Sequence, residues 1–338
     1  MMGHFPPVSA FVFSPKKVFI YYGFLGDNNF GDELVFESAK KIFEPEILVP
    51  VRKLMPITLK LYCILFKSKI SGIVIGGGTL IGPFWNHNIF LELVKIKKPV
   101  YIHGTGVYPD INCKDDWKKM LGGHVYGGVR GPLSQKNSMA ITNQIKITGD
   151  AAFAMFEKKL FNQSQYEKKY VLLNLGTHFD YEYQDDSRAE IKKLIHNLIQ
   201  EKYNLVFLPF HDIDKKIGES LILEFPEIVL LSQPYSYKNA MDIFQNSIFS
   251  IGERLHFTAM SILSGCPFVS INYSNKHEDM LQSIGLSLFG VQPGGFYFHD
   301  LKNRFVDRFV IDWKSIEFSL NNFKELQISE KNSFLSEQ

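Results

Sequence analysis

Short apolar runs alternate with longer amphipathic stretches along the first half of the chain. The apolar runs predict strands at 18–22, 47–49, 72–75, 100–102, 124–126 and 144–147. The amphipathic stretches predict helices at 32–43, 56–66, 86–97, 114–121 and 132–139. This alternation is typical of parallel strands with right-handed crossovers and with helices on both faces of the sheet.

The pattern pauses in a charged and polar stretch and then starts again. Further strands are predicted at 171–175, 205–208, 228–231, 248–251 and 267–272, and further helices at 187–200, 215–224, 237–245 and 254–263. We therefore predict an α/β fold with two doubly wound, Rossmann-like domains that face each other across a cleft. The expected divisions are a first domain at 1–156, a linker at 157–169, a second domain at 170–310 and a C-terminal segment at 311–338 that packs back on the junction.

The composition fits a globular protein with more than one core. The chain has 338 residues, of which 45% are hydrophobic and 21% are charged, and two domains are the usual solution at this length. The formal net charge of +2 gives no broad electrostatic attraction for nucleic acid, so we expect no such partner.

The cysteines and the N-terminal sequence indicate the cellular compartment in which the protein is expected. Cys63, Cys113 and Cys266 are odd in number and far apart, which suggests neither a disulfide framework nor a zinc site. The first residues lack the basic and apolar regions of a signal peptide, and no apolar run reaches the roughly 20 residues that span a bilayer. We expect a cytoplasmic protein.

One apolar stretch leaves two interpretations open. Residues 54–66 are flanked by Arg52 and Lys53 on one side and by Lys67 and Lys69 on the other. An amphipathic helix of this kind can lie on a membrane surface, which would place the protein peripherally at the inner face of the membrane. A helix that faces the core and carries ordinary solvated lysines at its ends is the alternative.

Glycines and acids follow two strands of the first half. Gly31, Asp32 and Glu33 open a predicted helix, where the acids either cap the helix or bind a sugar hydroxyl as hydrogen-bond partner or general base. After another strand, Gly76, Gly77 and Gly78 precede Thr79, and their backbone N–H groups can form a nest for a phosphate or carboxylate. Neither segment has the Gly-x-Gly-x-x-Gly pattern, so no nicotinamide cofactor is expected.

Two further residues of the first half are candidates. His103 comes directly after the predicted strand 100–102, where its side chain is either structural or directed into the cleft. Arg130 stands just before a helix that starts with Pro132, a position from which a guanidinium can bind an anion with two hydrogen bonds. Asp150 also follows a strand, and a capping role explains it best.

Arg254, Leu255 and His256 form the most informative motif. They stand between a predicted strand and a predicted helix. A helix N-terminus favours anions, and the added arginine and histidine supply a cation and a proton donor or acceptor. His211 and Lys276 also follow strands of this half, either as part of the same site or as solvated side chains. The motif predicts an enzyme site for a small phosphorylated anion.

Taken in order, these motifs resemble the polysaccharide pyruvyl transferase family over most of the chain. The matching positions are 31–33, 76–80, 130, 132–134, 150, 254–256, 264–267, 272, 273 and 276. His103, Gly131, Glu253 and Asn275 depart from the family's pattern, which bears on the acceptor sugar more than on the fold.

The resemblance implies a GT-B-like pair of domains and transfer of pyruvyl from phosphoenolpyruvate to a saccharide as a ketal, in exopolysaccharide or cell-surface glycan biosynthesis. Arg130, Arg254 and the glycine nests suit the donor's phosphate and carboxylate, and His256 is the candidate general acid. Asp32 or His103 is the candidate base. The scheme requires no metal, and the saccharide is either free or lipid-linked.

Two other functions fit the same pattern. One is a GT-B glycosyltransferase that uses a sugar nucleotide, although no acid for the ribose hydroxyls stands out in the second half. The other is a non-catalytic saccharide-binding protein of a polysaccharide assembly complex, which the presence of both Arg254 and His256 disfavours.

Overall fold

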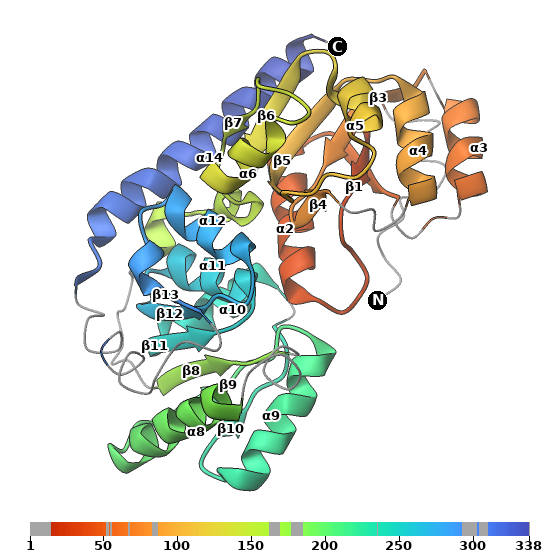
Figure 1. Cartoon of the computed structure of the whole chain (residues 1–338). Helices are drawn as coiled ribbons and strands as arrows, with labels where there is room; N and C mark the ends of the chain where they lie inside the picture. Colours follow the sequence, from red (N-terminus) through yellow and green to blue (C-terminus); the bar gives the residue numbers. More distant parts are fainter. Residues whose placement is uncertain are drawn as a thin grey trace. The chain divides into compact units, whose positions relative to one another are not determined.

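In the computed structural model the chain forms two compact units (Figure 1). The structure describes residues 15–51, 54, 56–66, 68–82, 87–161, 170–176, 185–234, 236–292, 303 and 310–337. The first unit comprises residues 1–27, 32–155 and 322–338, and the second comprises residues 28–31 and 156–321. A short piece of the first half therefore joins the second unit, and the C-terminal end of the chain returns to the first.

The first unit is built on a parallel sheet. Its strands are β1 (Val18–Tyr22), β2 (Ile47–Pro50), β3 (Ile70–Ile75), β4 (Thr79–Ile81), β5 (Val100–Val107), β6 (Val125–Val129) and β7 (Lys146–Ile147). Their order is β2-β1-β3-β5-β6-β7, with β4 paired to β5, and every pair is parallel. The order reverses between β1 and β3, which makes this the point where open α/β sheets bind ligands.

Helices cover both faces of this sheet. They are α2 (Phe30–Phe43), α3 (Pro56–Phe66), α4 (His87–Ile96), α5 (Lys114–Leu121), α6 (Pro132–Ser138), the short 3-10 helix η1 (Ala151–Met155) and the C-terminal α14 (Trp313–Ser336). Alternate residues of β1 enter two separate cores: Ile20 packs with residues of α4 and α5, and Phe19 packs with residues of α2 and α14. Phe334 of α14 lies 5.5 Å from the Phe19 ring.

The second unit has the strand order of the Rossmann fold. Its strands are β8 (Tyr170–Asn174), β9 (Leu205–Phe207), β10 (Val229–Leu230), β11 (Ser247–Gly252), β12 (Phe268–Ile271) and β13 (Gly290–Val291). Their order is β10-β9-β8-β11-β12-β13, again all parallel. The reversal of order falls between β8 and β11, so this is the expected ligand position in the second unit.

Five helices surround the second sheet in the described part of the chain. They are α8 (Asp185–Gln200), α9 (Asp212–Glu224), α10 (Tyr237–Gln245), α11 (Leu255–Ser264) and α12 (Asn275–Ser283), with the 3-10 turns η2 (Lys158–Leu160) and η3 (Ser287–Phe289). Apolar residues of α8 and α9 pack on β8 and β9 in the main core. Helix α11 is buried along its whole length, which fixes its N-terminus firmly.

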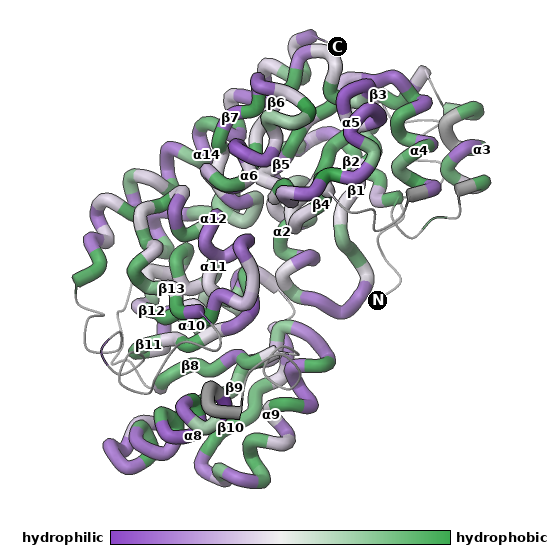
Figure 2. The backbone as a smooth tube through the Cα atoms, viewed as in Figure 1, coloured by the Kyte–Doolittle hydropathy of each residue, from purple (hydrophilic) through white to green (hydrophobic). Residues whose placement is uncertain are grey.

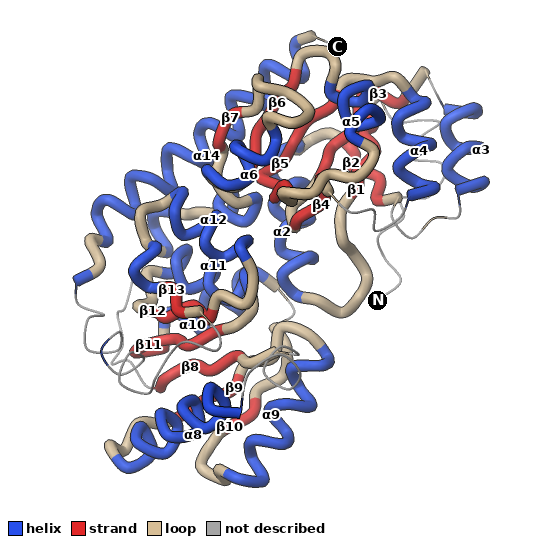
Figure 3. The backbone as a smooth tube through the Cα atoms, in the orientation of Figure 1, coloured by secondary structure: helices blue, strands red, loops and turns tan. Residues whose placement is uncertain are grey.

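The predicted fold class is confirmed: both sheets are parallel and doubly wound, and Figure 3 marks their strands in red and the helices in blue. The predictions were wrong in detail at β5, which continues through His103 to Val107 although we predicted an end at 102. Gly104 and Gly106 obscure the strand in the sequence, because glycine has low β propensity although the strand is buried on both faces. The short strands β4 and β13 carry too few residues to give a pattern. The cleft between the domains stays a prediction.

Candidate functional site

The candidate residues concentrate where the strand order reverses in each sheet. In the first unit, Gly76, Gly77 and Gly78 directly follow β3. In the second unit, Asn174 ends β8, and Arg254 follows β11. At such a reversal, the loops that follow the two neighbouring strands run to opposite faces of the sheet. This leaves a crevice at the carboxyl ends of the strands where a ligand can bind.

Packing explains why the loop after β3 is made of glycines. A Cβ atom on Gly77 would lie 2.5 Å from a methyl carbon of Val35, and one on Gly76 would lie 2.2 Å from the Tyr21 hydroxyl. Gly78 has φ +87, a conformation that side chains rarely adopt. The loop therefore presents backbone rather than side chains at the edge of the sheet, as a nest for an anion requires.

Arg130 fixes this glycine loop by donating hydrogen bonds to it. Its Nε donates to Asp150 at 2.8 Å, its Nη2 donates to the Gly78 carbonyl oxygen at 2.6 Å, and its Nη1 donates to Thr79 Oγ1 at 3.4 Å. The Arg130 and Asp150 side chains are both fully buried. Direct contact between Arg130 and an anion stays a prediction; in this structure the guanidinium fixes the conformation of the loop.

His103 lies inside β5 and not at the end of a strand, which corrects its predicted placement. Ser38 Oγ donates to the Ala151 carbonyl oxygen at 2.6 Å, so at 3.0 Å it accepts from His103 Nε2, and the imidazole carries its proton on Nε2. Complete burial lowers the pKa of His103 to about 4, against a smaller opposing effect of Asp150. His103 is therefore neutral near pH 7.

Asp32 and Glu33 occupy the first turn of α2, as predicted from the sequence. Both are half-buried. Glu33 Oε1 accepts from the Gly26 N–H at 3.2 Å. Glu33 thus fixes the loop after β1, and Asp32 occupies the helix N-terminus, where a carboxylate is favoured.

Arg254 is held in a fixed orientation by Asp214, a residue that the sequence patterns did not single out. Arg254 Nε lies 3.0 Å and 3.2 Å from the two carboxylate oxygens of Asp214, and Nη2 lies 2.5 Å from Oδ1. Asp214 is fully buried, while 17% of the Arg254 side chain is exposed. Burial alone would lower the pKa of Arg254, but the hydrogen bonds and charge of Asp214 outweigh it and raise the pKa.

Asn174 and the backbone just before α9 complete this arrangement. Asp214 Oδ2 also accepts from the Phe210 N–H at 3.1 Å and from Asn174 Nδ2 at 3.2 Å. The same Asn174 accepts the Arg254 N–H on its Oδ1 at 3.1 Å. One side chain at the end of β8 therefore fixes both the backbone and the counter-ion of Arg254.

Glu253 is buried next to Arg254 and serves the backbone around it. Its Oε2 accepts from the Gly176 N–H at 2.7 Å, and its carbonyl oxygen accepts from His277 Nε2 at 2.8 Å. A Cβ atom on Gly176 would lie 2.9 Å from Glu253 Oε1. The acid that departs from the family's sequence pattern thus ties together the ends of β8 and β11.

His256 stands in the first turn of α11 and packs against Gly31. A Cβ atom on Gly31 would lie 2.3 Å from His256 Nδ1 and 2.7 Å from its Cγ, and both residues belong to the second unit. His256 is 7% exposed and Leu255, the first residue of α11, is 5% exposed. Gly31 therefore leaves the space that the imidazole fills.

The remaining two candidates have structural partners. His211 is the N-cap of α9, and its Nδ1 accepts from the Ile213 N–H at 3.1 Å. Lys276 donates to the Tyr273 hydroxyl, and its ammonium lies 4.3 Å from the centre of the same ring. Tyr273 also influences Arg254 electrostatically, so Lys276 belongs to the surroundings of Arg254.

Within each unit, then, the structure brings together most of the predicted residues. The first unit joins the glycine loop, Thr79 and Arg130, and the second joins Gly31 with His256. Asp214 and Asn174 were missed. An acid in the first turn of a helix is ordinarily explained by the helix dipole, and only the burial of Asp214 distinguishes it.

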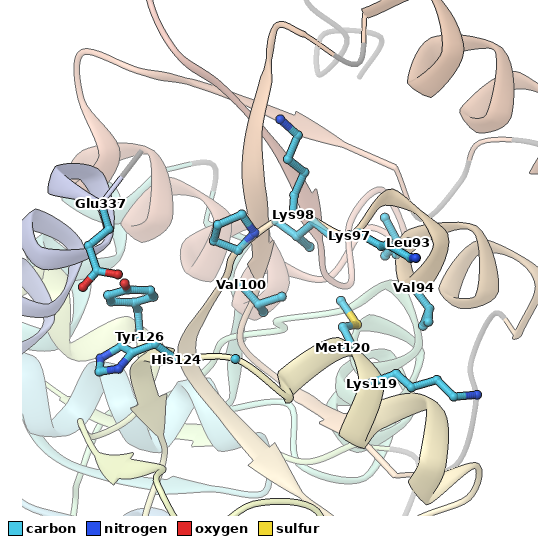
Figure 4. A pocket seen from close by; sticks show the side chains of 13 residues that line it. Leu93, Val94, Lys97, Lys98, Val100, Lys119, Met120, His124, Tyr126 and Glu337 are labelled. Carbon is cyan, nitrogen blue, oxygen red and sulfur yellow. The ribbon is translucent and has the colours of Figure 1, made fainter.

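A separate cavity of about 690 Å³ lies in the first unit. Figure 4 shows its lining, which includes Val100 at the start of β5, Tyr126 at the start of β6 and the preceding His124. It is thus at the amino ends of β5 and β6, whereas the glycine loop follows the carboxyl end of the parallel strand β3. None of the predicted site residues lines it.

Neither a metal cluster nor a membrane span is found in the part of the chain that the structure describes. No group of three or more histidine, cysteine, aspartate or glutamate side chains there is placed to hold a metal ion. No described helix has both the length and the apolar character needed to cross a bilayer.

Solved structures with the same fold are distant in sequence. UDP-GlcNAc 2-epimerase from Neisseria meningitidis is 11% identical, with 95% of this chain and 100% of that chain covered and a TM-score of 0.58. A putative UDP-N-acetylglucosamine 2-epimerase from Listeria monocytogenes is 10% identical, with 90% and 91% covered and a TM-score of 0.56. The likeness shows the GT-B-like fold of two Rossmann-like domains and nothing of the activity.

The sequence comparison is more specific. No protein with a curated description matches the chain significantly. The family model for polysaccharide pyruvyl transferase, however, matches residues 29–275. This match spans the glycine loop, Arg130, Asp214, Arg254 and His256. The chain therefore belongs to the polysaccharide pyruvyl transferase family.

Proposed function

We propose that the protein transfers a pyruvyl group from phosphoenolpyruvate to a pair of saccharide hydroxyls and forms a ketal. The observation that carries this proposal is the geometry of Arg254. Its Nε and one hydrogen of Nη2 are used by Asp214, whereas no hydrogen bond from Nη1 exists among the residues that the structure describes. A partly exposed guanidinium edge at a helix N-terminus suits a dianionic donor.

The donor's two anionic groups have two kinds of binding site in the chain. In the second unit, Arg254, Leu255 and the N-terminal end of α11 are candidates for binding one group. In the first unit, the glycine nest of residues 76–78 with Thr79, shaped by Arg130, is a second candidate for an anionic group. Lys276 adds a cation to the surroundings of Arg254, and His211 serves as the N-cap of α9. Arg130 and Arg254 are each fixed by a buried aspartate, so their side chains need little ordering when the donor binds.

His256 is the proposed general acid. It protonates the enol methylene carbon of phosphoenolpyruvate, which leaves C2 electrophilic. One sugar hydroxyl then adds to C2 and loses its proton. The C2–O bond to phosphate breaks, and a second hydroxyl adds and loses its proton. The two hydroxyls give up two protons in total. One restores the proton that His256 gave to the new methyl group of the ketal, and the other leaves with phosphate.

Asp32 is the better candidate for the base among the two considered. It is half-buried at a helix N-terminus, and Gly31 precedes it beside His256. His103 is neutral and so retains a lone pair on Nδ1, but it is fully buried inside β5. We assign to His103 a structural role, since its Nε2 donates to Ser38 Oγ, which in turn donates to the Ala151 carbonyl oxygen.

The acceptor is a saccharide, either free or lipid-linked, in exopolysaccharide or cell-surface glycan biosynthesis. The family match supports the saccharide. We place the reaction in the cytoplasm, at the inner face of the membrane where a lipid-linked acceptor would be presented.

Two experiments test the proposal. Thermal-shift titrations with phosphoenolpyruvate, a sugar nucleotide or a free saccharide should show stabilisation by phosphoenolpyruvate. Phosphate release from phosphoenolpyruvate is then measured against a panel of saccharides, and the products are weighed by mass spectrometry for a gain of one pyruvyl ketal. Stabilisation by the sugar nucleotide alone would favour a glycosyltransferase, and stabilisation by saccharide alone would favour a binding protein.

A further inference from the structure

Helix α3 carries an apolar face that the first unit leaves uncovered. Ile57, Leu61, Ile64 and Leu65 are 64%, 53%, 64% and 70% exposed. Their spacing of four, three and one residues places them on one side of the helix. Exposed apolar residues that occur singly are normal, but four large ones on one helix form a patch that marks an interaction site.

The opposite side of α3 already has its packing partners. Leu59 is 1% exposed and belongs to the main core of the first unit, and Phe66 packs against the same core. The helix is therefore rich in hydrophobic residues, and much of α3 is green in Figure 2. The side with Leu59 and Phe66 packs on the core of the first unit. A helix that only packed on this core would have a polar outer side.

The surrounding sequence indicates the charge of whatever covers this face. Between Glu46 and Glu92 there is no acidic residue, while there are five basic ones: Arg52, Lys53, Lys60, Lys67 and Lys69. A stretch of this length would contain about five acids at the chain's overall frequency. Lys60 and Lys69 are exposed; the other three lie outside the residues whose side chains are described.

We propose that α3 is a docking surface for an anionic lipid bilayer. Its four exposed apolar side chains enter the interface between headgroups and acyl chains, and the lysines around them contact lipid phosphates. A second copy of the chain fits less well, because a symmetric pair through this face would bring the two sets of cations together. Docking of this kind is independent of the donor chemistry, and it brings the protein to the place where a lipid-linked acceptor would be found.

Co-sedimentation of the full chain with vesicles tests the proposal without any substrate. We expect binding to vesicles of phosphatidylglycerol and phosphatidylcholine in equal parts at about 0.1 M salt, and little binding at about 1 M salt, where the Debye length falls from about 10 Å to about 3 Å. The double variant Ile64→Ser/Leu65→Ser should bind at least about tenfold more weakly. Lys60→Glu should also bind about tenfold more weakly at low salt.

Matched variants in the second unit serve as controls. Leu223 and Leu288 are 87% and 69% exposed, so Leu223→Ser/Leu288→Ser removes as much exposed apolar surface, and Lys238→Glu repeats the charge reversal. Both should bind vesicles as the parent does. Should the α3 double variant fail to fold, hydrogen exchange of residues 56–66 in the parent gives the second measurement, and slowed exchange on addition of anionic vesicles is expected.

Three results would overturn the proposal. They are no binding to anionic vesicles at low salt, equal binding to pure phosphatidylcholine, and a concentration-dependent dimer that Ile64→Ser/Leu65→Ser abolishes. If the α3 double variant loses vesicle binding but still releases phosphate fully with a soluble acceptor, the proposed reaction stands. If the parent binds vesicles but releases no phosphate from phosphoenolpyruvate, the docking surface stands and the proposed reaction fails.

Discussion

Asp214 engages one edge of the Arg254 guanidinium with both carboxylate oxygens, and Nη1 makes no hydrogen bond to any residue that the structure describes. Asp214 is fully buried and is itself held by Asn174 and the Phe210 N–H. The carboxylate lowers the net positive charge of the site, but it also removes the freedom of a long, flexible side chain before the donor arrives. For an anion that must be aligned for reaction, the second effect should dominate.

Asp214→Asn is therefore expected to lower kcat/KM for phosphoenolpyruvate by about 10–100-fold, corresponding to a charge-assisted hydrogen bond. When Arg254 is already replaced by Lys, Asp214→Asn should lower kcat/KM much less, because Asp214 acts through Arg254. Steady-state kinetics of the four proteins give the coupling, with the exposed Asp242→Asn as control. Strictly additive losses would show that Asp214 is merely structural.

Arg254→Ala should weaken phosphoenolpyruvate binding by about 1.5–3 kcal/mol, since it removes charge-assisted hydrogen bonds to the donor. It also leaves the carboxylate of Asp214 without its cation, so Arg254→Ala/Asp214→Ala is the matched variant that removes both charges. Calorimetry measures the affinity of each. Unchanged affinity in both variants would contradict the assignment of Arg254 to the donor.

Arg130→Ala should both weaken donor binding and destabilise the fold. The change leaves Asp150 as a buried, unpaired carboxylate, which typically costs about 3–5 kcal/mol. Arg130→Met/Asp150→Leu removes both charges and should recover much of the melting temperature. If donor affinity recovers together with stability, Arg130 supports the site only through its ion pair with Asp150; if affinity stays low, the guanidinium is needed for its hydrogen bonds to the glycine loop or to the donor.

His256→Gln and His256→Ala should both reduce turnover by about 10²–10⁴-fold while much of the donor affinity is retained. Gly31→Ala should resemble them, because its new Cβ atom would lie 2.3 Å from His256 Nδ1. Gly123→Ala, which meets nothing within 4 Å, is the control. Turnover of His256→Gln within a few-fold of the parent at every pH would move the acid elsewhere.

His103 should make the fold sensitive to mild acid. Its pKa is about 4 in the folded protein against 6.5 for the ordinary group, so the unfolded chain takes up the proton first as pH falls. The stability linked to His103 is complete above pH 6.5, declines as pH falls toward 4, and declines no further below that, by a total on the order of 3 kcal/mol. Denaturant unfolding of the parent and of His103→Gln between pH 4 and 7 measures the difference, which should vanish if His103 is solvated.

The sequence by itself determined the fold class and the places where chemistry occurs. Alternation of apolar and amphipathic stretches requires parallel strands with crossover helices, and Gly76, Arg130 and Arg254 therefore stand at strand ends whatever the details of packing. The local periodicity of 2 and 3.6 residues is a property of the chain, which is why these elements were predictable without coordinates.

Only the tertiary structure decided how those residues are engaged. Asp214 is 40 residues from Arg254 in the chain, and Asp150 is 20 residues from Arg130, so no local pattern reveals either ion pair. Burial likewise sets the charge state of His103, and it separates the packed side of α3 from the exposed one. Contacts between distant segments and the desolvation they cause depend on the whole fold, and so they are absent from any short stretch of sequence.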